Sequence, residues 1–328
     1  MIKTILDILI IWLILYILFI AILKLWYKVK KFILKQLAIS CNKDFENKQY
    51  KKEIKKINWL IRLSPLPSNY SLRAGVFSKL KQYDKAIKDI SKAIDINPYY
   101  AAFYQSRAYY YSEIGENDLA IKDFNSAIDL KFNPKDDYNL FLYRAQSLED
   151  KKEYQLAIND YDIVIKNIPE EIEAYIGKGI CLSNLEQYEE AIETYNQGIE
   201  IDNTDSALFV NKGNALSALQ KYEDSLLSYQ KAIELDNNNY YAYYNRGLSL
   251  YNLKKVNEAL LDLNKALELS PKSEDSHLFL CLGDLYAIVE KDNEKAMSFL
   301  QKAKELGNKH AQEDIDELNS TGTIVLEW

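Results

Sequence analysis

Two consecutive stretches of the chain share one pattern: residues 172–205, IEAYIGKGICLSNLEQYEEAIETYNQGIEIDNTD, and residues 206–239, SALFVNKGNALSALQKYEDSLLSYQKAIELDNNN. The two have the same length, and each has an aromatic residue at position 4, a glycine at position 8 and a small residue at position 20. The small residue recurs along the chain as Ala86, Ala120, Ala157, Ala191, Ser225, Ala259 and Ala296. Neighbouring members of this series are one such length apart, except that two of the intervals are longer by three residues. A fixed period of this size predicts stacked helix–turn–helix units, and therefore an all-α solenoid.

The apolar positions of a unit indicate how its two helices pack. Positions 4, 8 and 11 lie on one face of the first helix, because steps of three or four residues return to the same side. Small residues at positions 8 and 20 let the two helices approach closely, and no unit can bury its apolar face without a neighbour. Seven units start at Pro67, Ala101, Tyr138, Ile172, Ser206, Tyr240 and Ser276. Tyr50, Leu60 and Pro65 indicate a degenerate unit before them.

The N-terminal segment contains the longest apolar run of the sequence. Residues 8–23 carry no charge, and a helix over residues 5–27 would be roughly 34 Å long, enough to cross a hydrocarbon core of about 30 Å. We predict a single-pass transmembrane helix there; a buried core helix and a cleaved signal peptide are the alternatives, against which the lack of a polar stripe and of a small-residue cleavage site argue. Five lysines follow the segment: Lys24, Lys28, Lys30, Lys31 and Lys35. The positive-inside bias therefore predicts repeats that face the cytoplasm.

The charge of the chain is distributed unevenly. Residues 1–63 contain 13 Lys/Arg and 4 Asp/Glu, whereas the remainder contains 28 and 44. An acidic array is unsuited to nucleic acid, because phosphate contacts need clustered cations. Three scattered cysteines, Cys41, Cys181 and Cys281, indicate no disulfide framework. The predicted order is a short N-terminal end (1–4), a transmembrane helix (5–27), a basic juxtamembrane helix with the degenerate repeat (28–66), seven repeats (67–309), and a capping helix with an apolar tail (310–328).

The repeated pattern resembles the tetratricopeptide repeat (TPR). It reads as an aromatic residue, a small residue and a large one on the first helix, then Ala, an aromatic residue, Ala and Pro on and after the second. The last unit, with Leu282-Gly283-Asp284-Leu285-Tyr286, is more similar to the related Sel-like repeat, and the polar helix 311–319 would cap the stack. The resemblance implies a right-handed superhelix whose concave wall of first helices binds peptides or partner proteins. It implies no catalysis.

Positions 7 and 23 of the units vary together. Where position 7 is Arg, position 23 is Asp; where it is Lys, position 23 is Thr or Ser. The matched occurrence predicts four structural ion pairs: Arg73–Asp89, Arg107–Asp123, Arg144–Asp160 and Arg246–Asp262. A row of ligand-binding arginines is the alternative interpretation. If the pairs are half exposed, each contributes about 0.5 kcal/mol to stability.

The concave wall is the candidate binding surface. Positions 2, 5, 6, 9, 12 and 13 of the first helices face away from the second helices, and several carry Asn, Gln or Tyr. Asn amides can bond the backbone of an extended peptide, and Tyr rings can pack against its side chains. The candidate residues are Asn211, Asn214, Tyr241, Tyr244, Asn245, Tyr251, Asn252, Gln105, Tyr109, Tyr143 and Gln146. An idle polar surface, in which the amides bond only to neighbouring helices, is the alternative.

No catalytic, cofactor-binding or metal-binding constellation is evident in the sequence. The two histidines, His277 and His310, have no partner at metal-ligand spacing. TPR proteins that bind the acidic tail of heat-shock chaperones use a clamp of two Asn and three cations. Asn214 and Asn245 occupy the two Asn positions, but Val210, His277 and Cys281 occupy the cationic ones. We therefore expect no binding of a chaperone carboxylate tail.

The sequence supports one leading function. We predict a membrane-anchored, non-enzymatic scaffold that binds a protein or peptide through its TPR array. The alternative is a stable accessory subunit of a membrane enzyme or of a secretion or assembly complex.

Overall fold

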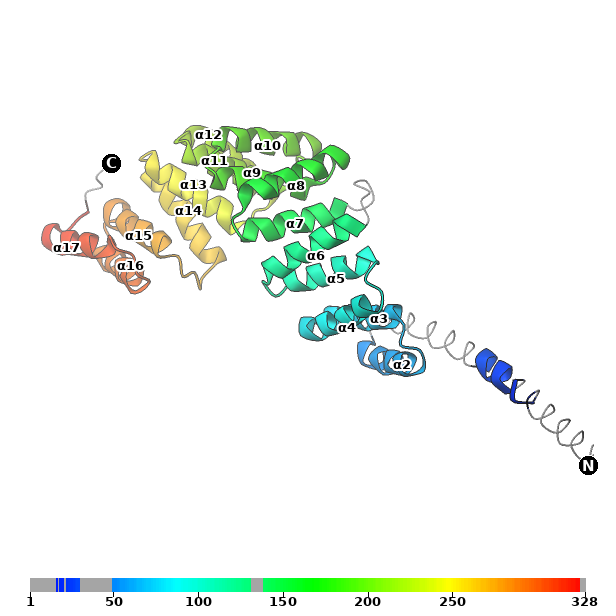
Figure 1. Cartoon of the computed structure of the whole chain (residues 1–328). Helices are drawn as coiled ribbons and strands as arrows, with labels where there is room; N and C mark the ends of the chain where they lie inside the picture. Colours follow the sequence, from blue (N-terminus) through cyan, green and yellow to red (C-terminus); the bar gives the residue numbers. More distant parts are fainter. Residues whose placement is uncertain (1–15, 17, 21, 30–48, 131–137, 325–328) are drawn as a thin grey trace, which may run out of the picture. The chain divides into compact units, whose positions relative to one another are not determined.

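The structure is a computed structural model that describes residues 16, 18–20, 22–29, 49–130 and 138–324. Within these ranges the chain is helical and contains no strand (Figure 1). The helices are α2 (Tyr50–Leu63), α3 (Pro67–Lys79), α4 (Tyr83–Ile96), α5 (Ala101–Ser112), α6 (Asn117–Leu130), α7 (Tyr138–Asp150), α8 (Tyr154–Asn167), α9 (Ile172–Asn184), α10 (Tyr188–Ile201), α11 (Ser206–Ala218), α12 (Tyr222–Leu235), α13 (Tyr240–Asn252), α14 (Val256–Leu269), α15 (Ser276–Leu285), a π-helical turn η1 (Tyr286–Glu290), α16 (Asn293–Glu305) and α17 (Ala311–Thr321).

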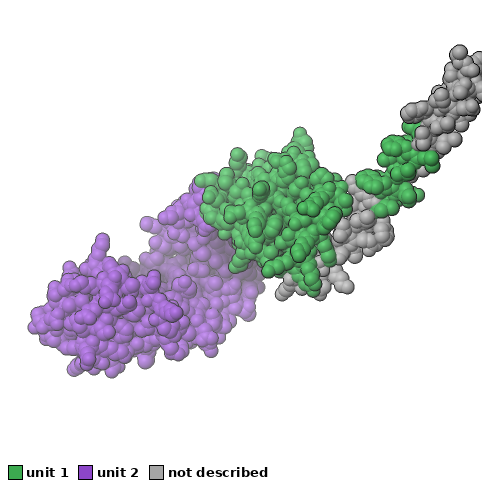
Figure 2. Space-filling view, turned by 90° about the horizontal axis from the view of Figure 1, so that it is seen from below, with its two compact units in different colours: residues 1–133 green, residues 134–328 purple. Residues whose placement is uncertain are grey.

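The chain divides into two compact units, residues 1–133 and 134–328 (Figure 2). In the first unit, α3 packs on α4 and α5 on α6; in the second, each odd-numbered helix from α7 to α15 packs on the helix that follows it. Helix α17 packs on α16 at the end of the second unit. Each pair corresponds to one repeat of the sequence pattern, and all seven predicted repeats begin where the first helix of a pair begins.

The core of each pair is formed by the positions that the sequence pattern selects. The small residues at position 20, such as Ala86 and Ala191, are fully buried, and the large residue at position 24 fills the space beside them. That residue is among the largest fully buried side chains: Ile90, Phe124, Tyr161, Tyr195, Tyr229, Leu263 and Leu300. Burial of these side chains between helices supplies most of the stabilising free energy of such an array.

The turn between the two helices of a repeat uses a left-handed backbone conformation. The residue at position 15 has a positive φ in all seven repeats, allowing for the extra residue of the last one: Lys81, Gly115, Lys152, Glu186, Gln220, Lys254 and Lys291. Only one of them is a glycine, although the left-handed region costs other residues about 1–2 kcal/mol. The tight antiparallel packing of the pair therefore outweighs a local backbone cost at six of these turns.

The interval from Ala259 to Ala296 is longer than one repeat by three residues, and the structure shows where these residues lie. Six residues separate α14 from α15, against four between α12 and α13. A further residue is accommodated in η1, because a π-helical turn holds one residue more than an α-helical turn. The other long interval coincides with residues 131–137, outside the described residues.

The two ends of the chain are described only in part. No helix in the described ranges is both long enough and apolar enough to cross a membrane. Residues 5–15, half of the predicted span, and the juxtamembrane residues 30–48 lie outside the described residues. Helix α2 stands where the second helix of the degenerate repeat is predicted, and α17 ends at Thr321, two residues beyond the predicted capping helix.

Candidate peptide-binding wall

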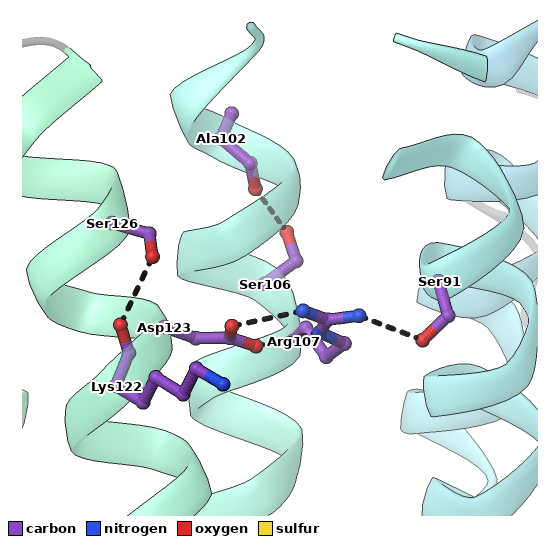
Figure 3. A network of polar contacts seen from close by, with 7 residues as sticks. All are labelled: Ser91, Ala102, Ser106, Arg107, Lys122, Asp123 and Ser126. Atoms are coloured by element: carbon purple, nitrogen blue, oxygen red, sulfur yellow. Dashed lines mark hydrogen bonds and ion pairs between the residues drawn. The ribbon is translucent and has the colours of Figure 1, made fainter. Parts of the chain in front are cut away.

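The four predicted Arg–Asp pairs are close, bidentate ion pairs. Figure 3 shows the second of them, in which Arg107 on α5 donates from Nε and Nη2 to the Asp123 carboxylate on α6, at 2.6 and 2.9 Å. The Arg144 guanidinium lies 2.6–2.7 Å from the Asp160 carboxylate oxygens. The other two pairs, Arg73–Asp89 and Arg246–Asp262, have the same form. Each guanidinium links the two helices of its own repeat.

These pairs are more buried than the sequence suggested. The arginine side chains are 18–22% exposed and the aspartates 4–9%. Burial raises the pKa of the Asp160 carboxyl, although the Arg144 guanidinium acts in the opposite direction. A contribution of about 0.5 kcal/mol to stability applies to exposed pairs. Removing one partner of these pairs should cost more than that, because it would leave a buried charge uncompensated.

Three of these arginines also reach back to the preceding repeat. Arg107 Nη1 donates to Ser91 Oγ on α4, at 3.0 Å (Figure 3), and Arg73 Nη1 donates to Asn58 on α2. Arg246 makes the same contact with Gln230. In one of the two repeats with a lysine at position 7, Lys178 Nζ contacts Asp162 at 2.6 Å. Asp162, like Ser91 and Gln230, stands at position 25 of the preceding repeat. In these four repeats the cation of position 7 thus joins consecutive repeats, a role that pairing within one repeat did not predict.

The candidate wall in the second unit contains two equivalent pockets, one repeat apart. The first, of about 200 Å³, is lined by Ile180, Ser183, Asn184, Tyr188, Tyr195, Asn211, Asn214 and Ala215. The second, of about 330 Å³, is lined by Asn214, Ser217, Ala218, Tyr222, Tyr229, Asn245, Leu248 and Asn252. Asn214 belongs to both. No lining residue is charged, so the pockets suit neutral side chains or a peptide backbone.

The asparagines of the two pockets form a hydrogen-bonded network. Asn214 Oδ1 accepts from Asn245 Nδ2 at 2.8 Å and from the Tyr229 hydroxyl at 2.9 Å. Within the described residues, no hydrogen-bond partner is found for Asn214 Nδ2 or Asn245 Oδ1. The network therefore fixes both amides and leaves one donor and one acceptor for a ligand, the pair of groups that complements a peptide unit.

The tyrosines of the second helices form the back of each pocket, and glycines make room for them. A Cβ atom at Gly179 would lie 2.3 Å from the Tyr195 ring, and one at Gly213 would lie 2.5 Å from the Tyr229 ring. Both rings are 1% exposed. A glycine at position 8 therefore lets a tyrosine at position 24 extend across the pair and reach the wall with its hydroxyl group.

Three of the predicted tyrosines lie on α13, beyond the second pocket. Tyr240 stacks on Tyr244 and contacts Tyr241 edge to face, with ring centroids 5.7 and 5.3 Å apart. The Tyr244 hydroxyl lies 3.3 Å from His277 Nδ1 on α15, and Tyr241 remains 66% exposed. Tyr251 instead donates its hydroxyl proton to Asp284 Oδ2 at 3.0 Å. Tyr241 and Tyr244 thus form an aromatic surface on α13, whereas Tyr251 packs against α15.

The remaining candidates line neither of the two pockets. Gln105 and Tyr109 lie on α5, in the first compact unit. Tyr143 and Gln146 lie on α7, in the second unit but in neither pocket lining. The described site is therefore the wall of α9, α11 and α13, which we call the asparagine wall, and it contains Asn211, Asn214, Asn245 and Asn252 of the predicted set.

The prediction missed the contribution of the second helices. Tyr188 and Tyr222 stand at position 17, and Tyr195 and Tyr229 at position 24; all four line the pockets. Their recurrence at the same positions of consecutive repeats was visible in the sequence. A tyrosine repeated opposite a glycine at position 8 is the signal that could have identified them.

The comparisons with known proteins agree with this architecture. Models of the tetratricopeptide repeat match residues 67–100, 101–134, 172–205 and 240–273, and a further TPR repeat model matches residues 213–254. The small glutamine-rich tetratricopeptide repeat-containing protein 2 of Saccharomyces cerevisiae is 41% identical over 71 residues, which are 21% of this chain. The matched segment spans only 20% of that relative.

Solved structures show the same fold. The C-terminal part of a TPR repeat-containing protein from Cytophaga hutchinsonii has a TM-score of 0.59 at 23% identity, over 73% of this chain and 97% of that one. A tetratricopeptide repeat protein from Parabacteroides merdae has a TM-score of 0.59 at 18% identity, over 76% and 97%. The Cut9–Hcn1 hetero-tetramer structure has a TM-score of 0.57 at 16% identity, over 85% and 55%.

Stacked helix pairs that repeat along the chain define the class of α-helical repeat proteins. Within that class, the repeated sequence pattern, the matching repeat models and the fold make this chain a tetratricopeptide repeat protein. Proteins of this kind are generally protein–protein interaction scaffolds. The similarity of the last repeat to the Sel-like repeat stays a prediction.

Proposed function

We propose that the protein is a membrane-anchored scaffold that binds an extended segment of a partner protein along the asparagine wall. The observation that carries the proposal is the pair of equivalent pockets, joined by Asn214. An extended chain offers a carbonyl and an N–H at each residue, and the Asn214–Asn245 network has a donor and an acceptor left for them. Such contacts hold a chain without reading its sequence, so the pockets and the exposed Tyr241 supply selectivity.

The chemistry of the wall favours a neutral or basic partner segment. Its pockets contain no cation, and the chain beyond residue 63 has more Asp/Glu than Lys/Arg. At the positions of the chaperone-tail clamp, Val210 and Cys281 are buried, 7% and 2% exposed. A peptide carboxylate would find no counter-charge there. We therefore propose that acidic C-terminal tails are not the ligands, and that binding of a basic segment weakens with added salt.

We expect the double substitution of Asn214→Ala with Asn245→Ala to weaken partner binding by about 1–3 kcal/mol, or roughly 5- to 150-fold. Both amides that bond the peptide would be lost. The partner is first captured from a membrane extract with the full-length chain, identified by mass spectrometry, and then titrated as a purified protein. A complex that stays stoichiometric through purification would favour the accessory-subunit alternative.

Asn159→Ala is the matched control, because Asn159 is an exposed asparagine on the second helix α8 and lines neither pocket. It should leave the affinity unchanged. If the double variant keeps its melting temperature and binds the partner as tightly as the wild type, the binding site lies elsewhere on the protein.

The membrane anchor is the other part of the proposal. Residues 8–23 are uncharged and apolar, and five lysines follow within twelve residues. We expect the full-length chain to stay with membranes during alkaline carbonate extraction, because a spanning helix is held by burial in hydrocarbon. Protease added outside intact cells should leave residues 64–328 uncut. Release by carbonate would disprove the anchor, and external digestion would disprove the orientation.

A further inference from the structure

Two leucines on neighbouring second helices are unusually exposed. Leu227 on α12 and Leu261 on α14 are each 72% exposed, and both stand at position 22 of their repeats, which are consecutive. The equivalent positions of the other repeats, allowing for the extra residue of the last one, hold polar residues: Lys88, Lys122, Asn159, Glu193 and Ser298. The paired leucines are therefore a local departure from a polar pattern, which makes this surface a candidate interaction site.

The surface between the two leucines is hollowed. A shallow cavity of about 440 Å³ lies between α12 and α14, with Leu226 and Leu250 in its lining and the Arg246–Asp262 pair beside them. Its lining shares no residue with the two pockets of the asparagine wall. A branched side chain from another surface could insert here, between Leu227 and Leu261.

The charges around the leucines follow one repeated arrangement. Asp224 precedes Leu227 by three residues and Lys231 follows it by four; Glu258 and Lys265 flank Leu261 at the same distances. Residues at these spacings share one face of a helix. Each helix thus presents an acid, a leucine and a lysine in line. We call these six residues the outer leucine patch: Asp224, Leu227, Lys231, Glu258, Leu261 and Lys265.

We propose that a second copy of this chain docks on the outer leucine patch, with its helices antiparallel to those of the first. Reversing the helix direction places Leu227 against Leu227 of the second copy, because the leucine lies nearly midway between the two charges. The same reversal brings Asp224 opposite Lys231 of the second copy, and α14 repeats the match. A parallel arrangement would set acid against acid. The patch is self-complementary in one orientation, as a two-fold interface requires.

The existing contacts of the lysines do not prevent this exchange. Lys231 lies 3.4 Å from Glu234, and Lys265 lies 3.1 Å from Glu268, one turn along the same helix. Exposed pairs of this kind contribute little to stability, so the lysines can turn to a new partner at small cost. Because two helix faces form a small interface, the dimer should be weak and sensitive to salt.

The test compares the self-association of the full-length chain and its variants by sedimentation velocity over a concentration series, in mild detergent. We expect a concentration-dependent dimer for the wild type. Leu227→Lys with Leu261→Lys should raise the dissociation constant at least tenfold. The matched control, Leu119→Lys with Leu156→Lys, changes exposed leucines on α6 and α8 and should not. A wild type that stays monomeric, or a dimer that survives the patch variant, would overturn the proposal.

Charge reversal tests the antiparallel orientation. Asp224→Lys with Glu258→Lys should weaken the dimer at least tenfold, and adding Lys231→Glu with Lys265→Glu should restore it, because the charges are then exchanged as pairs. In addition, Leu227→Cys should form a disulfide-linked dimer under mild oxidation, whereas Glu193→Cys on α10 should not. Failure of the fourfold variant to regain dimerisation, with circular dichroism showing an intact fold, would disprove this orientation.

Discussion

Replacing Asp284 by asparagine is expected to stabilise the protein at pH 8 and to change its stability little at pH 4. Asp284 on α15 is 4% exposed, and its Oδ1 atom has no hydrogen-bond partner among the described residues. Its Oδ2 atom accepts a single hydrogen bond, from the Tyr251 hydroxyl. Burial, followed by the negative charges of Asp314 and Glu317, raises the pKa of this carboxyl to about 7. The ionised form is thus poorly accommodated in the folded chain.

The sign of the effect follows from the two pKa values. The pKa of Asp284 is higher in the folded state than in the unfolded chain, where it is about 3.9. Between these values the folded protein binds more protons, so stability is lost as the pH rises from about 4 to about 7. Asparagine carries no charge and keeps an acceptor for Tyr251. At pH 8 the gain should be roughly 2–4 kcal/mol.

The measurement is the difference in melting temperature between the variant and the wild type at pH 8 and at pH 4. Because both proteins are compared at the same pH, the contributions of the other titrating groups to the melting temperature cancel in this difference. Asp316→Asn is the matched control, because Asp316 is an exposed acid of α17, the helix that carries Asp314 and Glu317. It should change stability by less than about 0.5 kcal/mol. An equal effect of Asp284→Asn at both pH values would contradict the argument.

The sequence predicted the helical pairs well because one rule governs all of them. Close approach of two helices needs a small residue at positions 8 and 20, and this need recurs in every repeat. The inserted residue of the last repeat could not be placed in the same way. Its longer interval was visible, but whether the extra residue lengthened a loop or formed η1 depends on how α15 packs.

The candidate site was predicted less completely than the fold. Helical periodicity identifies the face on which Asn214 and Asn245 lie, and it cannot show that Tyr229 reaches the same surface from the second helix. That contact depends on the missing Cβ at Gly213. The burial of Asp284 was also hidden, because its charged neighbours belong to α17, which lies beyond the next helix of the chain. Contacts between helices decide these features, and a single-sequence pattern does not contain them.

Arg144→Ala is expected to destabilise the protein by about 3 kcal/mol, and the loss should be greatest near neutral pH. The substitution removes both hydrogen bonds to the Asp160 carboxylate and leaves that carboxylate, 4% exposed, without its counter-charge. Burial already raises the pKa of Asp160, and loss of the guanidinium raises it further. Because the folded-state pKa then lies well above the unfolded one, protonation relieves part of the loss at low pH.

The next repeat of the chain suggests a second variant that should restore the stability lost in Arg144→Ala. In the next repeat, Lys178 stands in place of the arginine and Thr194 in place of the aspartate; Thr194 Oγ1 donates to the Glu190 carbonyl of its own helix. Arg144→Lys combined with Asp160→Thr should therefore recover most of the lost stability, because no buried carboxylate remains and the flexible lysine can extend its charge to solvent. Thermal melting of the full-length chain should show a fall of roughly 5–10 °C for Arg144→Ala and a much smaller one for the double variant. If the two variants melted at the same temperature, the buried charge of Asp160 would not be the cause, and the packing of the arginine side chain between α7 and α8 would account for the loss instead.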